Sequence, residues 1–283
     1  MSRASTSIAT VLIGLTSSLH ADPASWTAGP FDMPESAVFD ATHDRIIVSV
    51  IHGHPGEADG NGHLALLSLD GEILDPSWIT GLDAPKGMAI VGETLLVADL
   101  TRLHEIDLAA GTLLRSLDVG GAVFLNDITS DGEQAYVSDL MGNQIWHYQA
   151  GDMTVWLEEE ALAHPNGLFL DEERLVIGSW GQGLRDDFST EIPGALLSVD
   201  LETQSISTIV PRLGNLDGIV RIGDTLLVSD WITGQLFEVG ADGTHTVVAE
   251  YPAGLADIAA YDNTLILPSM LEGNVSARTY SHD

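Results

Sequence analysis

The sequence contains no cysteine, and this absence excludes two kinds of site. Without thiols the chain can form neither a disulfide framework nor a thiolate metal centre. Any metal ion held by its side chains must therefore be bound through oxygen or nitrogen atoms.

Positive charge is also scarce. The 283 residues include 10 Lys and Arg against 42 Asp and Glu, which gives a formal net charge of −32, and Lys86 is the only lysine. Binding to nucleic acid or to an anionic membrane surface requires clustered Lys and Arg. We therefore expect neither nucleic acid nor a membrane as a partner.

Long apolar runs are missing except near the N-terminus. There, Arg3 precedes an apolar stretch from Ile8 to Leu15, and a polar stretch ends at Leu19-His20-Ala21. This pattern is typical of an export signal, and the apolar run is too short to span a bilayer. We interpret residues 1–21 as a signal peptide, with a frayed apolar N-terminus as the alternative. Residues 22–283 are then expected to form a single periplasmic or secreted domain.

Several familiar catalytic motifs are absent as well. The chain has no Gly-x-Ser-x-Gly, no His-Glu-x-x-His and no Gly-Lys-Ser/Thr sequence. These absences argue against a serine hydrolase with a nucleophile elbow, a zincin and a phosphate-binding nucleotide hydrolase. Helical periodicity is nearly absent too, apart from one expected short turn over 158–163.

What the chain does contain is a repeated pair of strands. The clearest copy runs from His164 to Asp171 and then from Leu175 to Trp180. Its second, apolar strand recurs six times at spacings of 39 to 51 residues, ending at Val48, Val97, Val137, Ile177, Val228 and Leu267. Repeats of this length, built from short strands with acidic or Gly-containing turns, predict an all-β fold, a six-bladed β-propeller with four strands per blade.

The last repeat has too few strands to complete a blade. It supplies expected strands near 256–260, 264–268 and 274–280, and then the chain ends. The segment from Trp26 to Phe31 precedes the first repeat and has no other role in the pattern. We expect it to close the last blade as an N-terminal strand, because closure removes the open sheet edge.

Each innermost strand begins with a residue that should face the central channel. The alignment places these residues at Glu35, Lys86, Asn126, Asn166, Asp217 and Ala256. Four of them carry oxygen donors and come from separate blades. Such donors suit Ca²⁺, with Mn²⁺, Mg²⁺ or Zn²⁺ as alternatives. The other interpretation is a polar, water-filled channel in which these side chains satisfy one another.

Two of the repeats are longer than the others. Their extra residues, His52–Gly62 and Gly181–Gly194, follow second strands and should stand over the channel mouth as walls. Trp180 and Trp231 also follow second strands, where they could line a substrate site or pack between blades. His164 precedes Asn166 by two residues and is a further candidate for substrate contact.

Three acidic residues recur in a matching position. Asp99, Asp139 and Asp230 end second strands in the sequences Val-Ala-Asp, Val-Ser-Asp and Val-Ser-Asp. Equivalent positions in three repeats favour a shared architectural role. We expect these carboxylates to cap backbone N–H groups at the starts of loops.

Over residues 30–280 the chain resembles the regucalcin/gluconolactonase group of six-bladed propellers. The likeness rests on four short motifs: Pro34-Glu35-Ser36, Leu125-Asn126-Asp127, Pro165-Asn166-Gly167 and Leu216-Asp217-Gly218. It implies a divalent metal on the propeller axis. It further implies that Glu35, Asn166 and Asp217 are metal ligands, that Asp217 is also a general base, and that Asn126 contacts substrate or approaches the metal.

One position departs from the pattern of the group. Lactonases of the group carry an Arg two residues before the Asn of blade 3, where it contacts the sugar acid, and this chain has Phe124. Lys86 could supply the missing positive contact, or it could pair with an acid such as Glu35 or Asp217.

The resemblance implies a metal-dependent hydrolase that acts on a small lactone or ester. A lactone carbonyl would be polarised by the metal, while Asp217 activates water. The alternative is a non-catalytic propeller that binds a ligand or another protein, because fold does not determine function. Neither reading specifies the oligomeric state.

Overall fold

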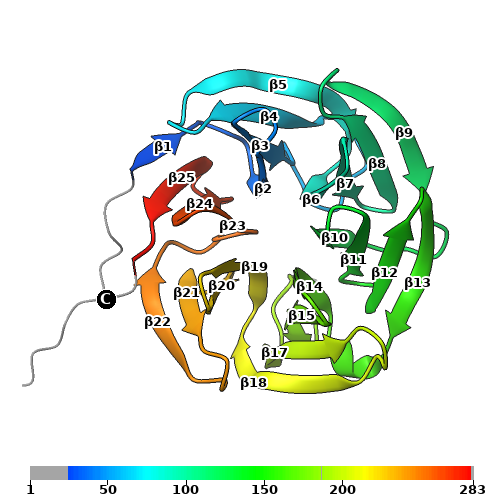
Figure 1. The fold of residues 1–283 in the computed structure, drawn as a ribbon, viewed down its shortest axis with the longest axis vertical. Coiled ribbons are helices and arrows are strands. Elements are labelled where there is room, and N and C mark those ends of the chain that lie inside the picture. The colour runs from blue at the N-terminus through cyan, green and yellow to red at the C-terminus, as the bar shows by residue number, and fades with distance from the viewer. Residues whose placement is uncertain (1–24, 186, 282–283) are drawn as a thin grey trace, which may run out of the picture.

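The structure is a computed structural model that describes residues 25–185 and 187–281. The expected signal peptide, residues 1–21, lies outside the described residues. Six antiparallel sheets are arranged as blades around a central axis, with β2, β6, β10, β14, β19 and β23 nearest the centre (Figure 1). The all-β, six-bladed propeller predicted from the repeats is confirmed.

The first three blades each contain four consecutive strands, ordered outward from the axis. Blade 1 consists of β2 (Pro34–Asp40), β3 (Arg45–Val50), β4 (Gly62–Ser68) and β5 (Ile73–Leu82). Blade 2 consists of β6 (Pro85–Val91), β7 (Thr94–Asp99), β8 (Arg102–Asp107) and β9 (Thr112–Asp118). Blade 3 consists of β10 (Leu125–Ser130), β11 (Gln134–Asp139), β12 (Gln144–Gln149) and β13 (Asp152–Glu158).

The later blades add one short strand and the closure of the ring. Blade 4 consists of β14 (Pro165–Asp171), β15 (Arg174–Ser179), β17 (Ile192–Asp200) and β18 (Ile206–Gly214), with β16 (Gly181–Gln182) also paired to β17. Blade 5 consists of β19 (Leu216–Ile222), β20 (Thr225–Asp230), β21 (Gln235–Val239) and β22 (His245–Glu250). Blade 6 consists of β23 (Ala259–Tyr261), β24 (Thr264–Ser269), β25 (Asn274–Thr279) and β1 (Trp26–Ala28).

Blade 6 is closed by the N-terminal segment, as predicted. Strand β1 pairs antiparallel with β25, with Trp26 opposite Ala277 and Ala28 opposite Val275 (Figure 1). The strand is shorter than the expected 26–31 segment. Because both ends of the described chain meet in one sheet, the ring is joined by hydrogen bonds between its first and last strands.

Helical structure in the described residues is limited to η1 (Glu160–Leu162), a single 3₁₀ turn within the expected 158–163 segment. Residues 25–185 and 187–281 include no apolar helix of membrane-spanning length.

The hydrophobic core lies in layers between neighbouring blades. One layer joins Ile47 and Leu64 of blade 1 to Met88 and Val97 of blade 2. Second strands are covered on both faces, and Ile47 and Val97 are fully buried. A strand buried on both faces reads as a continuous apolar run, which explains why the second strands gave the clearest repeat in the sequence.

Candidate functional site

The ring residues are aimed at the axis by β-bulges at the starts of the inner strands. The register shifts at this point in five blades, between Pro34/Ser36, Pro85/Met88, Leu125/Ile128, Pro165/Leu168 and Leu216/Ile219. A bulge inserts an extra residue and redirects a side chain, and each of these bulges contains one ring residue.

Five polar residues of the predicted ring meet in a single cavity of about 170 Å³. They form what we call the polar floor: Glu35, Lys86, Asn126, Asn166 and Asp217. The sixth ring residue, Ala256, is buried in an apolar cluster and does not line this cavity. Each of the five is buried, so the fold holds polar and charged groups away from bulk solvent at its axis.

Glycines beside the floor allow the inner strands to come close together. A Cβ placed on Gly167 would lie 1.5 Å from the carbonyl oxygen of Asp217. A Cβ on Gly218 would lie 2.1 Å from the backbone nitrogen of Ile258. The motifs Asn166-Gly167 and Asp217-Gly218 therefore combine a polar side chain on the axis with a residue that permits close approach of the next blade.

The two amides of the floor are connected to each other. Asn126 Nδ2 donates a hydrogen bond to Asn166 Oδ1, and Asn166 Nδ2 donates to the carbonyl oxygen of Leu216 at 3.0 Å. These contacts fix the orientation of Asn166, which is 1% exposed.

The carboxylates of the floor are less well satisfied. Glu35 Oε2 is buried and has no hydrogen-bond partner. Burial raises the pKa of Glu35 well above its ordinary value, the negative charges of Asp217 and Asp257 raise it further, and the charge of Lys86 acts in the opposite direction. Burial and Asp257 likewise raise the pKa of Asp217, although its hydrogen bond with Asn166 lowers it.

This donor set is chemically suited to a hard divalent cation. Among the described residues, no three His, Cys, Asp or Glu side chains come together as a metal-binding group. The floor instead combines two carboxylates with two amides, and carboxylate and amide oxygens are ligands that Ca²⁺ prefers. The unpartnered oxygen of Glu35 is an acceptor for which the protein itself provides no donor.

Lys86 is held mainly by backbone carbonyls. Its Nζ donates to the carbonyl oxygens of Ala84 at 2.8 Å and Pro55 at 3.0 Å, and lies 4.4 Å from the centre of the Phe124 ring. Burial lowers the pKa of Lys86 to about 8, against the opposing attraction of Glu35 and Asp99. Phe124, at the position of the expected Arg, therefore packs its ring face against the only lysine of the chain.

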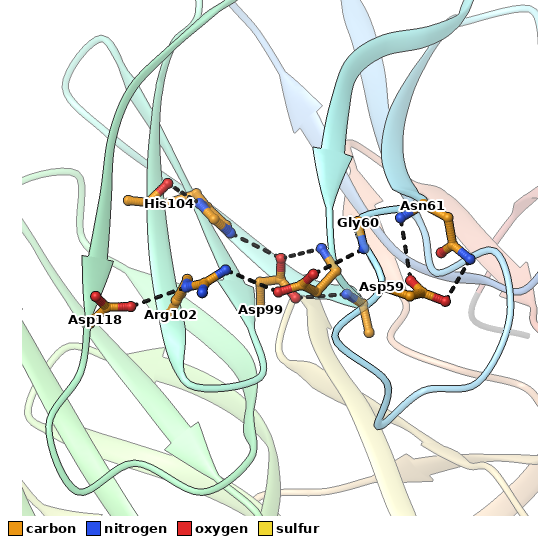
Figure 2. Close-up of polar contacts among 10 residues, drawn as sticks. Asp59, Gly60, Asn61, Asp99, Arg102, His104 and Asp118 are labelled. Atoms are coloured by element: carbon orange, nitrogen blue, oxygen red, sulfur yellow. Dashed lines mark hydrogen bonds and ion pairs between the residues drawn. The ribbon is translucent and has the colours of Figure 1, made fainter.

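A hydrogen-bond network around Asp99 holds the residues directly before β6 of blade 2 (Figure 2). Asp99 accepts from the backbone N–H groups of Asp83 and Ala84, both at 2.7 Å, and bonds His104 Nε2 at 2.9 Å. His104 Nδ1 in turn bonds Ser116 Oγ at 2.8 Å. Burial by itself would raise the pKa of Asp99, but the hydrogen bonds from His104 and the two N–H groups leave it below its ordinary value.

The loop between β3 and β4 is attached to this network. Asp83 accepts hydrogen bonds from Gly60 N at 3.0 Å and from Arg102 Nη1 at 3.1 Å (Figure 2). Pro55, from the same loop, supplies one of the two carbonyls that bind Lys86. The loop is thus attached at two points, to Asp83 just before β6 and to the Lys86 side chain of β6.

The other two strand-ending aspartates have comparable partners. Asp139 accepts from the backbone N–H groups of Val123 and Phe124 at 2.9 and 2.8 Å, so it fixes the backbone that carries Phe124. Asp230 accepts from those of Ile232 and Thr233 at 2.9 and 3.1 Å. All three carboxylates cap backbone N–H groups, as inferred from the repeat. Asp230 does so at the start of the following loop, whereas the N–H groups capped by Asp99 lie directly before β6.

An apolar wall rises above the polar floor. In every blade the residue directly after the second strand is apolar: Ile51, Leu100, Leu140, Trp180, Trp231 and Met270. All except Leu100 line the cavity. Only the two tryptophans were predicted from the sequence, although the shared register of all six residues after the second strands is readable from the repeat.

The two tryptophans both line the cavity and pack against each other between blades, which are the two alternatives that the sequence left open. Trp180 and Trp231 line the cavity, and their ring centres lie 6.1 Å apart across the boundary between blades 4 and 5. Both long loops also reach the cavity, one through Pro55 and the other through Asp187 and Phe188. The second insertion ends earlier than expected, because β17 already begins at Ile192.

His164 does not line the cavity with the other predicted site residues. Its Nδ1 bonds the carbonyl oxygen of Leu140 at 2.9 Å, and its backbone N–H donates to Asn143 Oδ1 at 2.8 Å. In this structure the ring therefore supports the Leu140 turn, and the substrate contact expected from the sequence would require a different orientation.

No protein-family model matches the sequence, and no curated protein matches it. Among solved structures, a gluconolactonase from Xanthomonas campestris is 14% identical with a TM-score of 0.66, over 87% of this chain and 85% of that one. A streptogramin B lyase is 13% identical with a TM-score of 0.60, over 89% and 95%. A chain of a nidogen/laminin complex is 13% identical with a TM-score of 0.65, over 78% and 87%. At such identities these likenesses establish the propeller fold, which is the fold of the group that the sequence resembles.

Proposed function

We propose that the chain is a divalent-cation-dependent hydrolase of lactones or related esters. The observation that carries the proposal is the buried, unpartnered Glu35 Oε2 on the floor of the cavity, beside Asp217 and the two amides. The shared fold of the Xanthomonas gluconolactonase adds support at the level of the scaffold.

Glu35, Asn166 and Asp217 would hold the cation, with Asn126 next to them. We propose Ca²⁺, with Mn²⁺, Mg²⁺ or Zn²⁺ as alternatives, because the donors are oxygen atoms of carboxylates and amides. Bound there, the cation supplies Lewis acidity that polarises a carbonyl group and stabilises developing negative charge. Two buried carboxylates with raised pKa values are a costly arrangement that a positive charge would stabilise.

Asp217 is proposed as the general base. It takes a proton from the attacking water, whose oxygen forms a bond to the carbonyl carbon of the lactone. The ring C–O bond then breaks, and the proton passes from Asp217 to the departing oxygen, so that the product is a hydroxy acid. A bound cation would favour the ionised form of this buried carboxylate, and in that form Asp217 can accept a proton.

Lys86 and Phe124 are proposed to position the substrate. Lys86 is anchored through two carbonyl contacts, so its charge has a fixed place beside the floor. Phe124 covers the ammonium on one side and contributes to the wall. Trp180 offers a flat apolar surface to the part of the substrate that does not react. Export of the mature chain stays a prediction from residues 1–21.

The test combines metal analysis with a hydrolysis screen. Protein purified without added metal is analysed for bound divalent ions. Glucono-δ-lactone, δ-valerolactone and dihydrocoumarin are then assayed with and without chelator, and after Ca²⁺ is restored. We expect chelator-sensitive hydrolysis and a fall in kcat/KM of about 10²- to 10⁴-fold in Asp217→Asn. Asp224→Asn, an exposed acid in the same β19–β20 hairpin, is the matched control and should keep wild-type rates.

Two outcomes would count against the proposal in different ways. Absence of a bound divalent ion together with no metal-dependent hydrolysis would remove the enzyme and favour the ligand- or protein-binding alternative. Full activity in Asp217→Asn would remove only the assignment of the base.

A further inference from the structure

The wall of the cavity differs sharply in chemistry from its floor. One side of the wall is an apolar cluster of Phe124, Leu140 and Trp180, against which Phe188 and Trp231 pack. The opposite side contains Ile51 and Met270, with Met33 and again Trp231. All of these residues line the cavity.

The few hydrogen-bond donors on the wall are already engaged. Trp180 Nε1 donates to the carbonyl oxygen of Phe188 at 2.8 Å, and Trp231 Nε1 contacts Met270 Sδ at 3.4 Å. On the floor, Lys86 also donates to two backbone carbonyls. Asp187 is the one charged side chain that lines the cavity outside the floor, among the described residues.

A polyhydroxylated ring would therefore find few partners above the floor. A hydroxyl that leaves water without gaining a hydrogen bond weakens binding by about ten-fold or more. An apolar substituent loses nothing of this kind, and each buried methylene strengthens binding by about four-fold.

The apolar surface continues from the cavity to the solvent. Eight large hydrophobic side chains of the described chain are exposed, and half of them follow or precede a wall residue directly in the sequence: Val123, Met141, Ile232 and Leu271. Leu271 itself lines the cavity and is 56% exposed. The remaining four lie on the outermost strands β5, β9 and β13.

We infer that the substrate is amphipathic: a small lactone or ester ring that carries an alkyl or aryl substituent. The carbonyl group lies at the polar floor, and the substituent lies along Phe124, Trp180 and Trp231 toward Leu271. The reaction in this inference rests on the proposed function, whereas the preference for an apolar substituent rests on the wall alone. Phe124 in place of an Arg fits the same preference, because it exchanges a charged contact for an apolar one.

The experiment compares substrates that share one ring. Values of kcat/KM are measured for δ-valerolactone, for δ-decalactone, which adds a pentyl chain, and for glucono-δ-lactone. In parallel, quenching of tryptophan fluorescence measures binding of 2-piperidinone and 6-pentyl-2-piperidinone, which are lactams that resist hydrolysis. We expect δ-decalactone to exceed δ-valerolactone by about 100-fold, which at about four-fold per carbon requires burial of only three to four of the five added carbons. Glucono-δ-lactone should be the poorest substrate.

A matched pair of variants tests whether the pentyl substituent of the substrate extends toward Leu271. Leu271→Asn should reduce the ratio of δ-decalactone to δ-valerolactone by about five-fold, because the pentyl group loses apolar contact at the mouth. Leu114→Asn on β9 is the control, since Leu114 is also 56% exposed but lies on an outermost strand. That ratio should not change in the control.

The outcomes separate this inference from the proposed function. If δ-valerolactone or glucono-δ-lactone is hydrolysed as well as δ-decalactone, the inference is overturned while the hydrolase stands. If no lactone is hydrolysed but the pentyl lactam binds far more tightly than 2-piperidinone, the apolar preference stands and the hydrolase is removed. If neither reaction nor lactam binding shows a preference for the pentyl group, the inference is wrong.

Discussion

Buried carboxylates occur in two places near the propeller axis, and their surroundings differ. Asp99 ends the second strand of blade 2, whereas Glu35 and Asp217 lie on inner strands and face the cavity. Asp99 is 1% exposed and bonds two backbone N–H groups and His104 (Figure 2). Glu35 is 5% exposed, and one of its oxygens has no partner. The pKa of Asp99 is lowered, whereas those of Glu35 and Asp217 are raised.

The contrast separates a structural acid from a functional candidate. Burial is nearly the same in both places, so burial alone does not distinguish them. The partners of Asp99 are all supplied by the fold, and its charge stabilises the native state. In Glu35 and Asp217 the fold disfavours the ionised carboxylate, which is the pattern expected where a site is shaped for a ligand.

The largest expected effect on stability is at Asp99. In Asp99→Asn an amide N–H would face backbone donors, so we expect the free energy of unfolding to fall by about 3 kcal/mol. Urea unfolding of protein treated with chelator measures this free energy. Asp118→Asn is the control, because the Asp118 side chain is 87% exposed at the far end of the same network. Equal stability of Asp99→Asn and wild type would show that the network does not stabilise the fold.

A cation should stabilise the other group by a similar amount. Calcium at about 100 times its dissociation constant should raise the free energy of unfolding by about 2.7 kcal/mol. Thermal unfolding of chelated protein with added CaCl₂ measures this gain, which Glu35→Gln should abolish. A calcium shift that persists unchanged in Glu35→Gln would place the ion elsewhere.

Without a bound cation, replacing the Glu35 carboxylate by an uncharged amide should stabilise the native state. In protein treated with chelator, we expect Glu35→Gln to raise the free energy of unfolding by about 1 kcal/mol, because burial and the neighbouring acids disfavour an ionised Glu35 and the amide carries no charge. Glu93→Gln, at an exposed turn, is the matched control. A loss of stability in Glu35→Gln would show that the Glu35 carboxylate has a stabilising partner in the native protein, which would contradict the unpartnered Oε2.

The stability that Asp99 contributes should depend on pH. Because the pKa of Asp99 is lowered on folding, its charge contributes stability above its unfolded pKa of about 4. That contribution is lost as the pH falls through the lower folded value. The stability difference between wild type and Asp99→Asn should therefore narrow as the pH falls below about 4. A difference that widens on acidification would contradict the sign.

The smallest effect is expected at the edge of the Asp99 network. Arg102 is 46% exposed and pairs with Asp83 and Asp118 (Figure 2). Exposed ion pairs contribute little, so Arg102→Ala should lower the free energy of unfolding by about 0.5 kcal/mol. A thermal melt measures it. A loss as large as that of Asp99→Asn would show that the exposed ion pairs of Arg102 stabilise the fold as much as the buried contacts of Asp99 do.

Much of the site was predictable because it follows the repeat. Glu35, Asn166 and Asp217 occupy one register position in separate blades, so aligning the strands was enough to bring them together. The wall residues Leu140 and Met270 obey an equally simple register, directly after the second strand, and could have been found in the same way. They were missed because a single apolar residue next to an apolar strand does not stand out.

The sequence by itself determined the six blades, their closure by β1 and the identity of the polar floor. These features depend on the period of buried strands, which local alternation and spacing record directly. Only the tertiary structure decided the partners of Lys86, the isolation of Glu35 Oε2 and the turning of His164 toward a carbonyl. Each depends on which backbone carbonyl or carboxylate of another segment lies within reach. Such contacts join residues far apart in the chain through the packing of blades, and they leave no periodic trace in the sequence.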